Sequence, residues 1–284
     1  MSGWEGQQKI TFDGQVALVT GAGRGLGAEY ARLLASRGAS VVVHDAGVTA
    51  DGDGFDPSVA DEVAQQISAE GGRAVACYEN LEDGAACRHL VQFAIDRFGR
   101  LDVLIHNAGL VVFSELKETS EKVWNRMVNL GVHAPYHLIR TALPIMQQQR
   151  YGRIVLTTSG RAFRVSDCVP GLVGYSVGKM AQLGLMVAVA AENQGNGVHI
   201  NAISPVAATR VLRRHRPELL PELVAPGVAF LASTACTISG VVLLAAGGRF
   251  QTARWTDRQG VDFGKTPADL ETIAARWPNI CGDL

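Results

Sequence analysis

Tyr175 and Lys179 stand four positions apart in the chain, a spacing that could support acid–base chemistry. On a helix, residues at i and i+4 share one face and lie about 6 Å apart along the axis. A tyrosine has a pKa of about 10, but a close positive charge favours the phenolate and lowers that pKa. Such a phenol can give a proton to a carbonyl oxygen while hydride reaches the carbon, or take it in reverse. The pair therefore predicts an acid–base site, although an ordinary surface helix can carry the same spacing by chance.

A serine precedes this pair, at the end of the apolar run 153–158. Open parallel sheets bind ligands at the carboxyl ends of their strands. Ser159 could therefore donate a hydrogen bond to the substrate oxygen that faces Tyr175. Thr158 is the alternative donor, and helix capping or turn formation would explain either residue without catalysis.

A glycine-rich loop, 20–27, separates the first apolar run from the first amphipathic stretch. Glycines let the backbone turn tightly and approach a pyrophosphate, and the amino end of the following helix favours the anion. The position of this loop directly after an apolar strand candidate strengthens the interpretation as a dinucleotide site. The loop residues that could contact the cofactor are Gly21, Gly23, Arg24, Gly25, Leu26 and Gly27.

Asp45 ends the second apolar run. A carboxylate at this place can accept both hydroxyls of an adenosine ribose and would repel a 2′-phosphate, so we expect NAD as the cofactor. Arg24 could instead meet a 2′-phosphate, which leaves NADP open on residue types alone. A turn before Gly47 is a further explanation for Asp45.

Short β-branched runs alternate with longer amphipathic stretches along the chain. This alternation is typical of an α/β fold with a doubly wound parallel sheet and helices on both faces. We expect a single domain over 1–284, with 249–284 as a C-terminal arm. The expected strands are 16–20, 40–44, 73–77, 101–106, 153–158, 198–203 and 240–245, and the expected helices are 25–37, 57–70, 83–98, 120–148, 175–194 and 224–233.

The composition excludes several classes of protein. The 284 residues include 26 Lys and Arg and 27 Asp and Glu, which gives a net charge of −1. Binding to nucleic acid needs a basic surplus, so we expect no nucleic-acid partner. A hydrophobic fraction of 47% is too high for a disordered chain. We also expect no membrane span, because no apolar run reaches roughly 20 residues, and no export signal begins the sequence.

The five cysteines are odd in number, scattered, and never spaced as CxxC. They predict reduced thiols in a cytoplasmic protein rather than disulfides or a zinc site. The loop 46–56 has Asp at alternate positions, but it lacks the downstream Glu of an EF-hand. We therefore expect no metal.

The order of these motifs resembles that of the short-chain dehydrogenase/reductase family, from about Gly14 to Gly248. The stretch 41–47 and the loop after it are most similar to the branch of 3-hydroxyacyl-CoA and hydroxysteroid dehydrogenases. The matching motifs are the loop Thr20–Gly27, Asn107-Ala108-Gly109, Ser159, Tyr175 with Lys179, and Asn201-Ala202-Ile203-Ser204-Pro205.

The resemblance implies a Rossmann-type domain that binds NAD and forms a homo-oligomer, usually a tetramer and otherwise a dimer. It implies Tyr175 as the general acid or base and Ser159 as the donor to the substrate oxygen. Lys179 would bind the nicotinamide ribose and tune Tyr175. The further implied cofactor contacts are Asn80 and Leu81 at the adenine, His106, Asn107 and Gly109 along the cofactor, and Pro205, Val206 and Ala208 near the nicotinamide amide.

The chain departs from the family at several positions, including Gly131 and His106. The family has an Asn in its long helix that holds a water between the lysine and solvent, and here that place falls on Gly131. Asn129 is two residues away and would face another side of the helix. A water in the space at Gly131, or His133 nearby, could replace the missing amide. His106 stands where the family has the first Asn of its NNAG motif.

Four arginines lie in segments where the family binds its substrate: Arg161, Arg164, Arg213 and Arg214. Clustered guanidinium groups bind phosphates through paired hydrogen bonds. They favour a phosphate-bearing acyl thioester, such as an acyl-CoA, as the substrate. A solvated loop is the alternative explanation of the second pair.

We therefore predict an NAD-dependent oxidoreductase that moves a hydride between nicotinamide and a secondary alcohol or ketone. The substrate could be a 3-hydroxyacyl thioester or, alternatively, a steroid or cyclic alcohol. A different class of function, a non-catalytic NAD-binding sensor or scaffold, is favoured by Gly131. The presence of Ser159, Tyr175 and Lys179 favours the enzyme.

Overall fold

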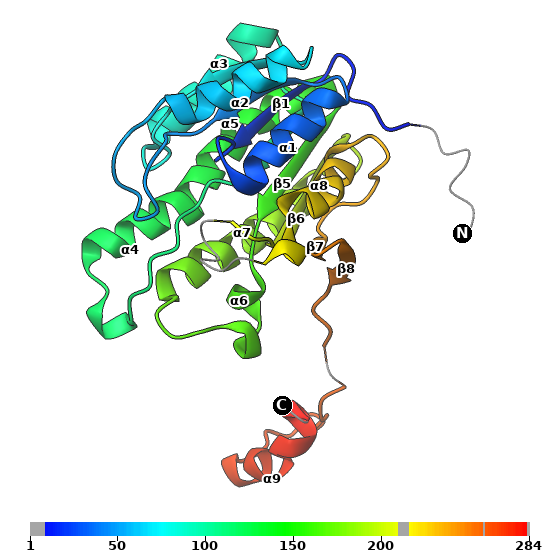
Figure 1. The fold of residues 1–284 in the computed structure, drawn as a ribbon. Coiled ribbons are helices and arrows are strands. Elements are labelled where there is room, and N and C mark those ends of the chain that lie inside the picture. The colour runs from blue at the N-terminus through cyan, green and yellow to red at the C-terminus, as the bar shows by residue number, and fades with distance from the viewer. Residues whose placement is uncertain (1–8, 210–215, 258, 283–284) are drawn as a thin grey trace. The chain divides into compact units, whose positions relative to one another are not determined.

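A computed structural model describes residues 9–209, 216–257 and 259–282 of the chain. The chain forms two compact units, residues 1–252 and 253–284. All the chemistry-bearing motifs noted above lie in the first unit (Figure 1).

Eight strands form one sheet. The strands are β1 (Val16–Thr20), β2 (Ser40–His44), β3 (Arg73–Cys77), β4 (Val103–His106), β5 (Gly152–Thr157), β6 (Val198–Val206), β7 (Val242–Ala246) and β8 (Arg249–Ala253). Their order is β3-β2-β1-β4-β5-β6-β7-β8, and neighbouring strands from β3 to β7 are parallel. The order reverses between β1 and β4, the point where doubly wound sheets bind their ligands.

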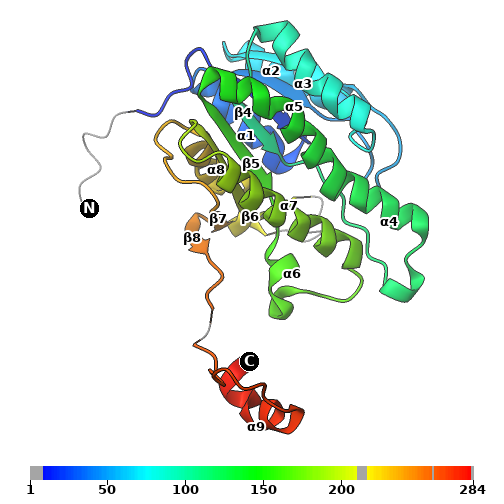
Figure 2. The ribbon, with the colours of Figure 1, turned by 180° about the vertical axis from the view of Figure 1, so that it is seen from behind.

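Helices of the first unit cover both faces of this sheet (Figures 1 and 2). The helices of the first unit are α1 (Gly25–Ser36), α2 (Ser58–Ala69), α3 (Gly84–Phe98), α4 (Glu121–Val128), α5 (Ala134–Gln149), α6 (Gly160–Phe163), α7 (Val173–Glu192) and α8 (Ala225–Ala232). The second unit contains α9 (Leu270–Cys281). Helix α1 contacts α2 and α8, whereas α3 contacts α5 and α4 contacts α7. The strands β1, β2, β4 and β5 are buried throughout, as expected for apolar runs covered on both sides.

The predicted α/β fold is confirmed, and the expected strands and helices occur with shifts of a few residues at their ends. Our prediction of one uninterrupted helix over 120–148 is wrong in one respect. A π-helical segment, Asn129–His133, separates α4 from α5. We call it the π segment below. Such segments occur often at functional sites.

The C-terminal part begins differently from what the sequence suggested. Residues 249–253 form β8, so the first residues of the expected arm belong to the sheet. Asp269 caps the amino end of α9, and its carboxylate accepts a hydrogen bond from the Thr272 amide at 2.7 Å. The role of 249–284 as an arm of a single domain stays a prediction.

One described helix, α7, is long and apolar enough to cross a membrane, which the apolar runs of the sequence did not indicate. It has 20 residues, and an 18-residue window of it has a mean hydropathy of 1.3. The helix packs against β5, β6, α4 and the π segment, and its buried face includes Lys179 and Gln182. A third of that window is buried, so one face of α7 packs in the core while Val177, Met180 and Val187 are exposed.

Candidate active site

The glycine loop between β1 and α1 packs closely against the segment that follows β4. A Cβ on Gly21 would lie 2.8 Å from the Cα of Ala108, and one on Gly27 would lie 2.1 Å from the carbonyl oxygen of Gly21. Among the described residues, no side chain caps the amino end of α1, and no acidic residue lies in its first turn. The first amides of α1 therefore suit an anion such as a pyrophosphate.

Asp45 follows β2 and lies beside this loop. Its carboxylate accepts hydrogen bonds from the amides of Gly23 at 3.0 Å and Gly47 at 2.8 Å. Each carboxylate oxygen has further acceptor capacity, so the group can still receive ribose hydroxyls. Arg24 is exposed and donates to the carbonyl of Val48 at 3.3 Å, on the same side. Asp45 and Arg24, the two residues that we expect to decide between NAD and NADP, therefore both lie at the glycine loop.

The predicted adenine contacts follow β3. Leu81 is buried, whereas Asn80 is exposed and its side-chain oxygen accepts from the Glu82 amide at 3.0 Å. Arg126 of α4 pairs with Glu82 at 3.1 Å and with Asp53 at 3.0 Å. The Asp-rich loop 46–56 is therefore linked through Arg126 to α4 and to the loop after β3, while most of its residues are exposed.

His106 at the end of β4 joins the glycine loop to the π segment. Its Nε2 lies 3.4 Å from the carbonyl oxygen of Leu130, which can only accept, so Nε2 carries the proton. Its Nδ1 then accepts from the Thr20 hydroxyl at 3.2 Å. Burial, with the charge of Lys179, lowers the pKa of His106 to about 3 and keeps the ring neutral. At the position where the family has an asparagine, His106 therefore has a structural role, the hydrogen bonds to Thr20 and Leu130.

Thr20 holds the start of the Asn107-Ala108-Gly109 segment. Its hydroxyl accepts from the amides of Asn107 and Ala108, each at 3.1 Å. The Asn107 side chain donates to the carbonyl of Gly21 at 3.0 Å. A Cβ on Gly109 would lie 3.3 Å from Nζ of Lys179, so this segment passes directly beside the lysine.

Tyr175 and Lys179 lie on the first two turns of α7. The Nζ atom of Lys179 is 5.9 Å from the centre of the Tyr175 ring. The lysine is buried, and its ammonium donates to the carbonyl of Thr157 at 2.7 Å, at the carboxyl end of β5. The predicted pair therefore shares one face and meets the expected edge of the sheet.

Ser159, rather than Thr158, faces the tyrosine. The hydroxyl of Thr158 is buried and donates to the carbonyl of Lys179 at 2.8 Å, so it has a structural partner. Ser159 caps α6 through the amide of Arg161 at 3.3 Å and forms a hydrogen bond with Tyr175 that lowers the tyrosine pKa. The catalytic role of Ser159 stays a prediction, and the geometry favours it over Thr158.

The ionisation of the pair differs from the sequence-based expectation. Burial raises the pKa of Tyr175, and the Ser159 hydrogen bond and the charge of Arg161 offset only part of this rise. Burial lowers the pKa of Lys179 to about 8. In this structure the phenol is therefore protonated at neutral pH, which suits proton donation to a carbonyl oxygen. The desolvation of both groups outweighs the attraction that we expected between them.

Lys179→Met is expected to abolish turnover and to reduce the pH dependence of stability. The folded-state pKa of about 8 lies below the usual value of 10.5, so the unfolded chain binds more protons between these pH values. The free energy of unfolding of the wild type therefore rises from pH 8 to 10.5. Below pH 8 the buried Lys179 is charged, and its burial lowers the stability by the full amount. Relative to the methionine variant, the wild type should gain about 2 kcal/mol between pH 7 and 10. Thermal unfolding of both proteins over this range, without cofactor, checks the prediction. A difference that stays constant with pH would contradict it.

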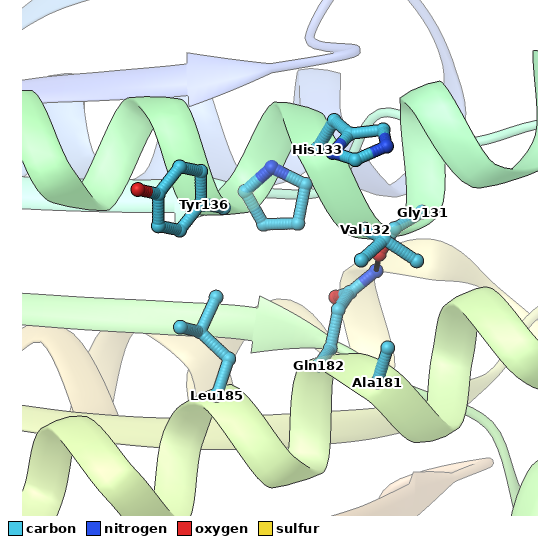
Figure 3. Close-up of a pocket in the computed structure, with 8 residues that line it drawn as sticks. Gly131, Val132, His133, Tyr136, Ala181, Gln182 and Leu185 are labelled. Carbon is cyan, nitrogen blue, oxygen red and sulfur yellow. Dashed lines mark hydrogen bonds between the residues drawn. The ribbon is translucent and has the colours of Figure 1, made fainter.

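Gly131 lies in the π segment, where its backbone contacts Gly178 of α7. A Cβ on Gly131 would lie 2.6 Å from the Cα of Gly178. The structure therefore leaves no room for a side chain here, so a helix asparagine is excluded by packing. His133 is exposed and lines a cavity on the outer side of the π segment (Figure 3).

Sequence reasoning missed Gln182. Its side chain points from α7 toward the π segment and donates to the carbonyl of Gly131 at 3.3 Å (Figure 3). Gln182 stands three positions after Lys179 and is buried, so its contact with Gly131 depends on how the two helices pack. The only signal in the sequence was a polar residue on an otherwise apolar helix.

The four arginines do not form one cluster among the described residues. Arg161 lies close enough to Tyr175 to lower the tyrosine pKa. Arg164 pairs with Asp167 at 2.7 Å. Arg213 and Arg214 lie outside the described residues. The substrate roles of all four stay predictions.

The last predicted cofactor contacts lie at and after the end of β6. Pro205 and Val206 are its final residues, and the amide of Ala208 donates to the carbonyl of Leu219 at 2.6 Å. Strands β5 and β6 are neighbours, so this turn leaves the same edge of the sheet as Ser159. The site residues therefore come from the ends of β1, β2, β3, β4, β5 and β6 and from the start of α7.

Comparisons with known proteins agree with this geometry. A family model described as short chain dehydrogenase matches residues 15–218. A short-chain type dehydrogenase/reductase of Mycobacterium tuberculosis is 37% identical over 273 residues, which cover 94% of this chain and 93% of the relative. A 3-oxoacyl-[acyl-carrier-protein] reductase of Synechocystis is 32% identical over 248 residues, 82% of this chain and 96% of that protein.

A longer relative is the peroxisomal multifunctional enzyme type 2 of Drosophila melanogaster. It is 37% identical over 286 residues, which cover 96% of this chain. The chain spans about half the length of that enzyme, 46%.

Solved structures share the fold. A short chain dehydrogenase from Mycobacterium avium has a TM-score of 0.82 and 32% identity over 96% of both chains. A metagenomic short-chain oxidoreductase in complex with NADP has a TM-score of 0.67 and 30% identity, with coverage of 78% of this chain and 91% of that one. Carveol dehydrogenase from Mycobacterium avium in complex with NAD has a TM-score of 0.74 at 24% identity, over 83% of this chain and 97% of that one, and shows the fold alone.

The predicted family is thus confirmed by the match over most of the chain and by relatives above 30% identity. The glycine cradle, the free first amides of α1 and the carboxylate beside them fit a dinucleotide. The chain belongs to the short-chain dehydrogenase/reductase family and is an oxidoreductase that uses NAD(P).

Proposed function

We propose that this oxidoreductase uses NAD(H) to interconvert a secondary alcohol and a ketone on an acyl thioester. The observation that carries the proposal is the meeting of Ser159, Tyr175 and Lys179 at the carboxyl edge of β5, beside the glycine cradle. The relative named as a 3-oxoacyl-[acyl-carrier-protein] reductase supports the choice of a thioester.

The mechanism follows from what these side chains can do. When bound, the nicotinamide accepts or supplies the hydride. Tyr175 gives its proton to the ketone oxygen during reduction, which its raised pKa favours, and takes the proton of the alcohol during oxidation. The Ser159 hydroxyl donates to the same oxygen. The Lys179 ammonium stabilises the phenolate form and holds the end of β5 through the carbonyl of Thr157.

The preference for NAD over NADP rests on Asp45. Its carboxylate lies beside the glycine loop, where it would meet a 2′-phosphate with like charge. Arg24 is engaged with the carbonyl of Val48 on the neighbouring loop, at 3.3 Å. We expect a Kd for NADH at least about tenfold below that for NADPH, since a repulsion of about 1.4 kcal/mol suffices. Fluorescence titration of the wild type with both nucleotides measures this ratio. Tighter binding of NADPH would defeat the preference.

The substrate class can be tested with two thioesters of one 3-oxoacyl group. One carries coenzyme A and the other carries N-acetylcysteamine, which has no phosphates. We expect turnover of both with NADH and a lower KM for the CoA ester, because guanidinium groups bind phosphates through charge-assisted hydrogen bonds.

Charge reversal at Arg213 and Arg214 provides the matched variant. The double variant to Glu should raise the KM for the CoA ester about tenfold, since charge-assisted hydrogen bonds contribute ~1.5–3 kcal/mol each. The KM for the N-acetylcysteamine ester should not change. An unchanged KM for acyl-CoA would show that Arg213 and Arg214 do not bind its phosphates. Turnover of a steroid or cyclic alcohol, without turnover of either thioester, would favour the alternative substrate class.

We also propose that the chain self-associates and works in the cytoplasm. Exposed apolar side chains on α5 and α7 support self-association: Tyr136, Val177, Met180 and Val187. Cytoplasmic location is supported by five free cysteines, three of them buried. Light scattering should give a multiple of the 30.2 kDa chain mass.

A further inference from the structure

The family's helix asparagine has no equivalent side chain at Gly131, yet two cavities meet at this glycine. The inner cavity has a volume of about 10 Å³ and is lined by Gly109, Leu130, Tyr175, Lys179 and other residues. A cavity of roughly this size holds one water. The outer cavity has a volume of about 420 Å³ between α5 and α7. Of the described residues that line the two cavities, Gly131 alone belongs to both.

Gln182 lines the outer cavity at this wall. Its Nε2 donates to the carbonyl of Gly131 at 3.3 Å, as drawn in Figure 3. Only 1% of the residue is exposed, and within the described part of the chain its Oε1 has no hydrogen-bond partner. Nearly all buried amide oxygens in proteins accept a hydrogen bond. We therefore expect Oε1 of Gln182 to accept one from a donor such as a water in the cavity.

The close contact of Gly131 with Gly178 explains why the polar side chain at this place comes from α7 and not from position 131. Because the two backbones touch, position 131 has no space for an amide side chain. Gln182 lies one helical turn beyond Gly178 on the same face of α7, so it can reach the Gly131 carbonyl from the other side. Gln182 thus contacts, from the side of the outer cavity, the backbone of the position at which the family carries its amide.

We propose that Gln182 is a positioning residue for proton exchange at Lys179, an inference that rests on the proposed function. Its Nε2 fixes the Gly131 carbonyl between the two cavities, and its Oε1 holds a water on the outer side. In alcohol oxidation the substrate proton passes to Tyr175 and then, by way of Lys179, to a water in the inner cavity, whose place beside the Gly131 backbone depends on the Gln182 contact. His133 also lines the outer cavity and is exposed.

Gln182→Met tests the proposal, because methionine keeps the length of the side chain and removes the amide. We expect kcat for alcohol oxidation to fall about tenfold, KM to stay within twofold, and the solvent deuterium isotope effect on kcat to increase. In the cofactor-free protein, hydrogen exchange of the amides in 130–134 should accelerate. Wild-type values of kcat and of the isotope effect in this variant would overturn the proposal. A fall in kcat with a comparable change in KM and an unchanged isotope effect would also overturn it.

Gln149→Met is the matched control. Gln149 also donates from its Nε2 to backbone carbonyls, those of Leu101 at 2.9 Å and Tyr151 at 3.3 Å, but it ends α5 far along the chain from the π segment. This variant should leave kcat, KM and the isotope effect unchanged. If it changes kcat and the isotope effect as Gln182→Met does, the effect belongs to general loosening and the proposal fails.

Gln182→Glu tests the same proposal if the methionine variant does not fold. A protonated carboxyl can still donate to the Gly131 carbonyl, whereas a carboxylate repels it. The kcat of this variant, relative to the wild type, should therefore fall as pH rises, and a constant ratio would overturn the proposal. Absence of any turnover by the wild type would instead defeat the proposed function, and the exchange rates in 130–134 would still report on the Gln182 contact.

Discussion

Tyr175→Phe is expected to lower kcat in both directions by about a thousandfold, since acid–base catalysis contributes roughly 10²–10⁴-fold. The phenylalanine ring keeps the packing of Tyr175 but cannot give or take the proton. Ser159 would still donate to the substrate oxygen and the nicotinamide would still meet the substrate. The loss should therefore appear in kcat, whereas the Kd for NADH should stay within about twofold.

The pH dependence of the wild type supplies the companion measurement. Burial raises the pKa of Tyr175 above its usual value in the cofactor-free structure, so the protonated phenol predominates at neutral pH. The rate of ketone reduction, which needs the proton, should therefore be constant near neutral pH and fall at alkaline pH. The rate of alcohol oxidation, which needs the phenolate, should rise as pH increases. Steady-state kinetics in both directions, followed through NADH absorbance, measure these slopes.

Two results would argue against this role. A kcat of Tyr175→Phe within tenfold of the wild type would mean that another group moves the proton. Equal, slow rates in both proteins with retained NADH binding would favour a dinucleotide-binding sensor or scaffold. Tyr78→Phe is a matched control, because Tyr78 donates to Asp61 at 2.6 Å behind the loop after β3 rather than facing Lys179.

Gly131→Asn should destabilise the protein, although it restores the residue type that the family carries at this position. The new Cβ would lie 2.6 Å from the Cα of Gly178, a distance at which one backbone must move. Overpacking of this kind costs about 1–3 kcal/mol or more. For a chain of this size each kcal/mol corresponds to roughly 2–4 °C in Tm. We expect a fall of several degrees and no gain in kcat, measured by thermal unfolding and steady-state kinetics.

Gly131→Ala separates the effect of packing from the effect of the amide. It adds the same Cβ and should produce most of the loss in Tm. Gly184→Ala is the control on α7, because a Cβ there meets no described atom within 4 Å and the residue is exposed. This change should leave Tm unchanged or raise it, since alanine favours a helix over glycine by about 1 kcal/mol. If Gly131→Asn keeps the wild-type Tm and raises kcat, the missing asparagine is a simple loss and Gln182 does not replace it.

Two side chains contact carbonyl groups of the π segment: His106 contacts the carbonyl of Leu130, and Gln182 contacts the carbonyl of Gly131. Neither side chain touches the other's carbonyl, so the two contacts can be removed separately. Both carbonyls lie in the segment that lines the inner cavity at Lys179.

The alternation of apolar runs and amphipathic stretches was sufficient to predict the parallel sheet, because each buried strand carries its own β-branched residues. The glycine loop, Asp45, Ser159 and the Tyr175–Lys179 pair were equally visible, since each is a local motif beside a strand end. The π segment was not visible. It packs against α7 through Gly131 and Gly178, which are 47 positions apart in the chain, so no local pattern reports this contact.

The ionisation of the site also required the tertiary structure. Spacing alone suggested that Lys179 lowers the tyrosine pKa, but burial of both groups has the larger effect and raises it. Desolvation depends on every element that surrounds a group, so no local pattern reports it. Residue types and their order therefore determined the family and the fold of this protein and predicted its reacting groups. The burial of Tyr175 and Lys179, and the contact of the buried Gln182 amide with the π segment, followed only from the packing of α7.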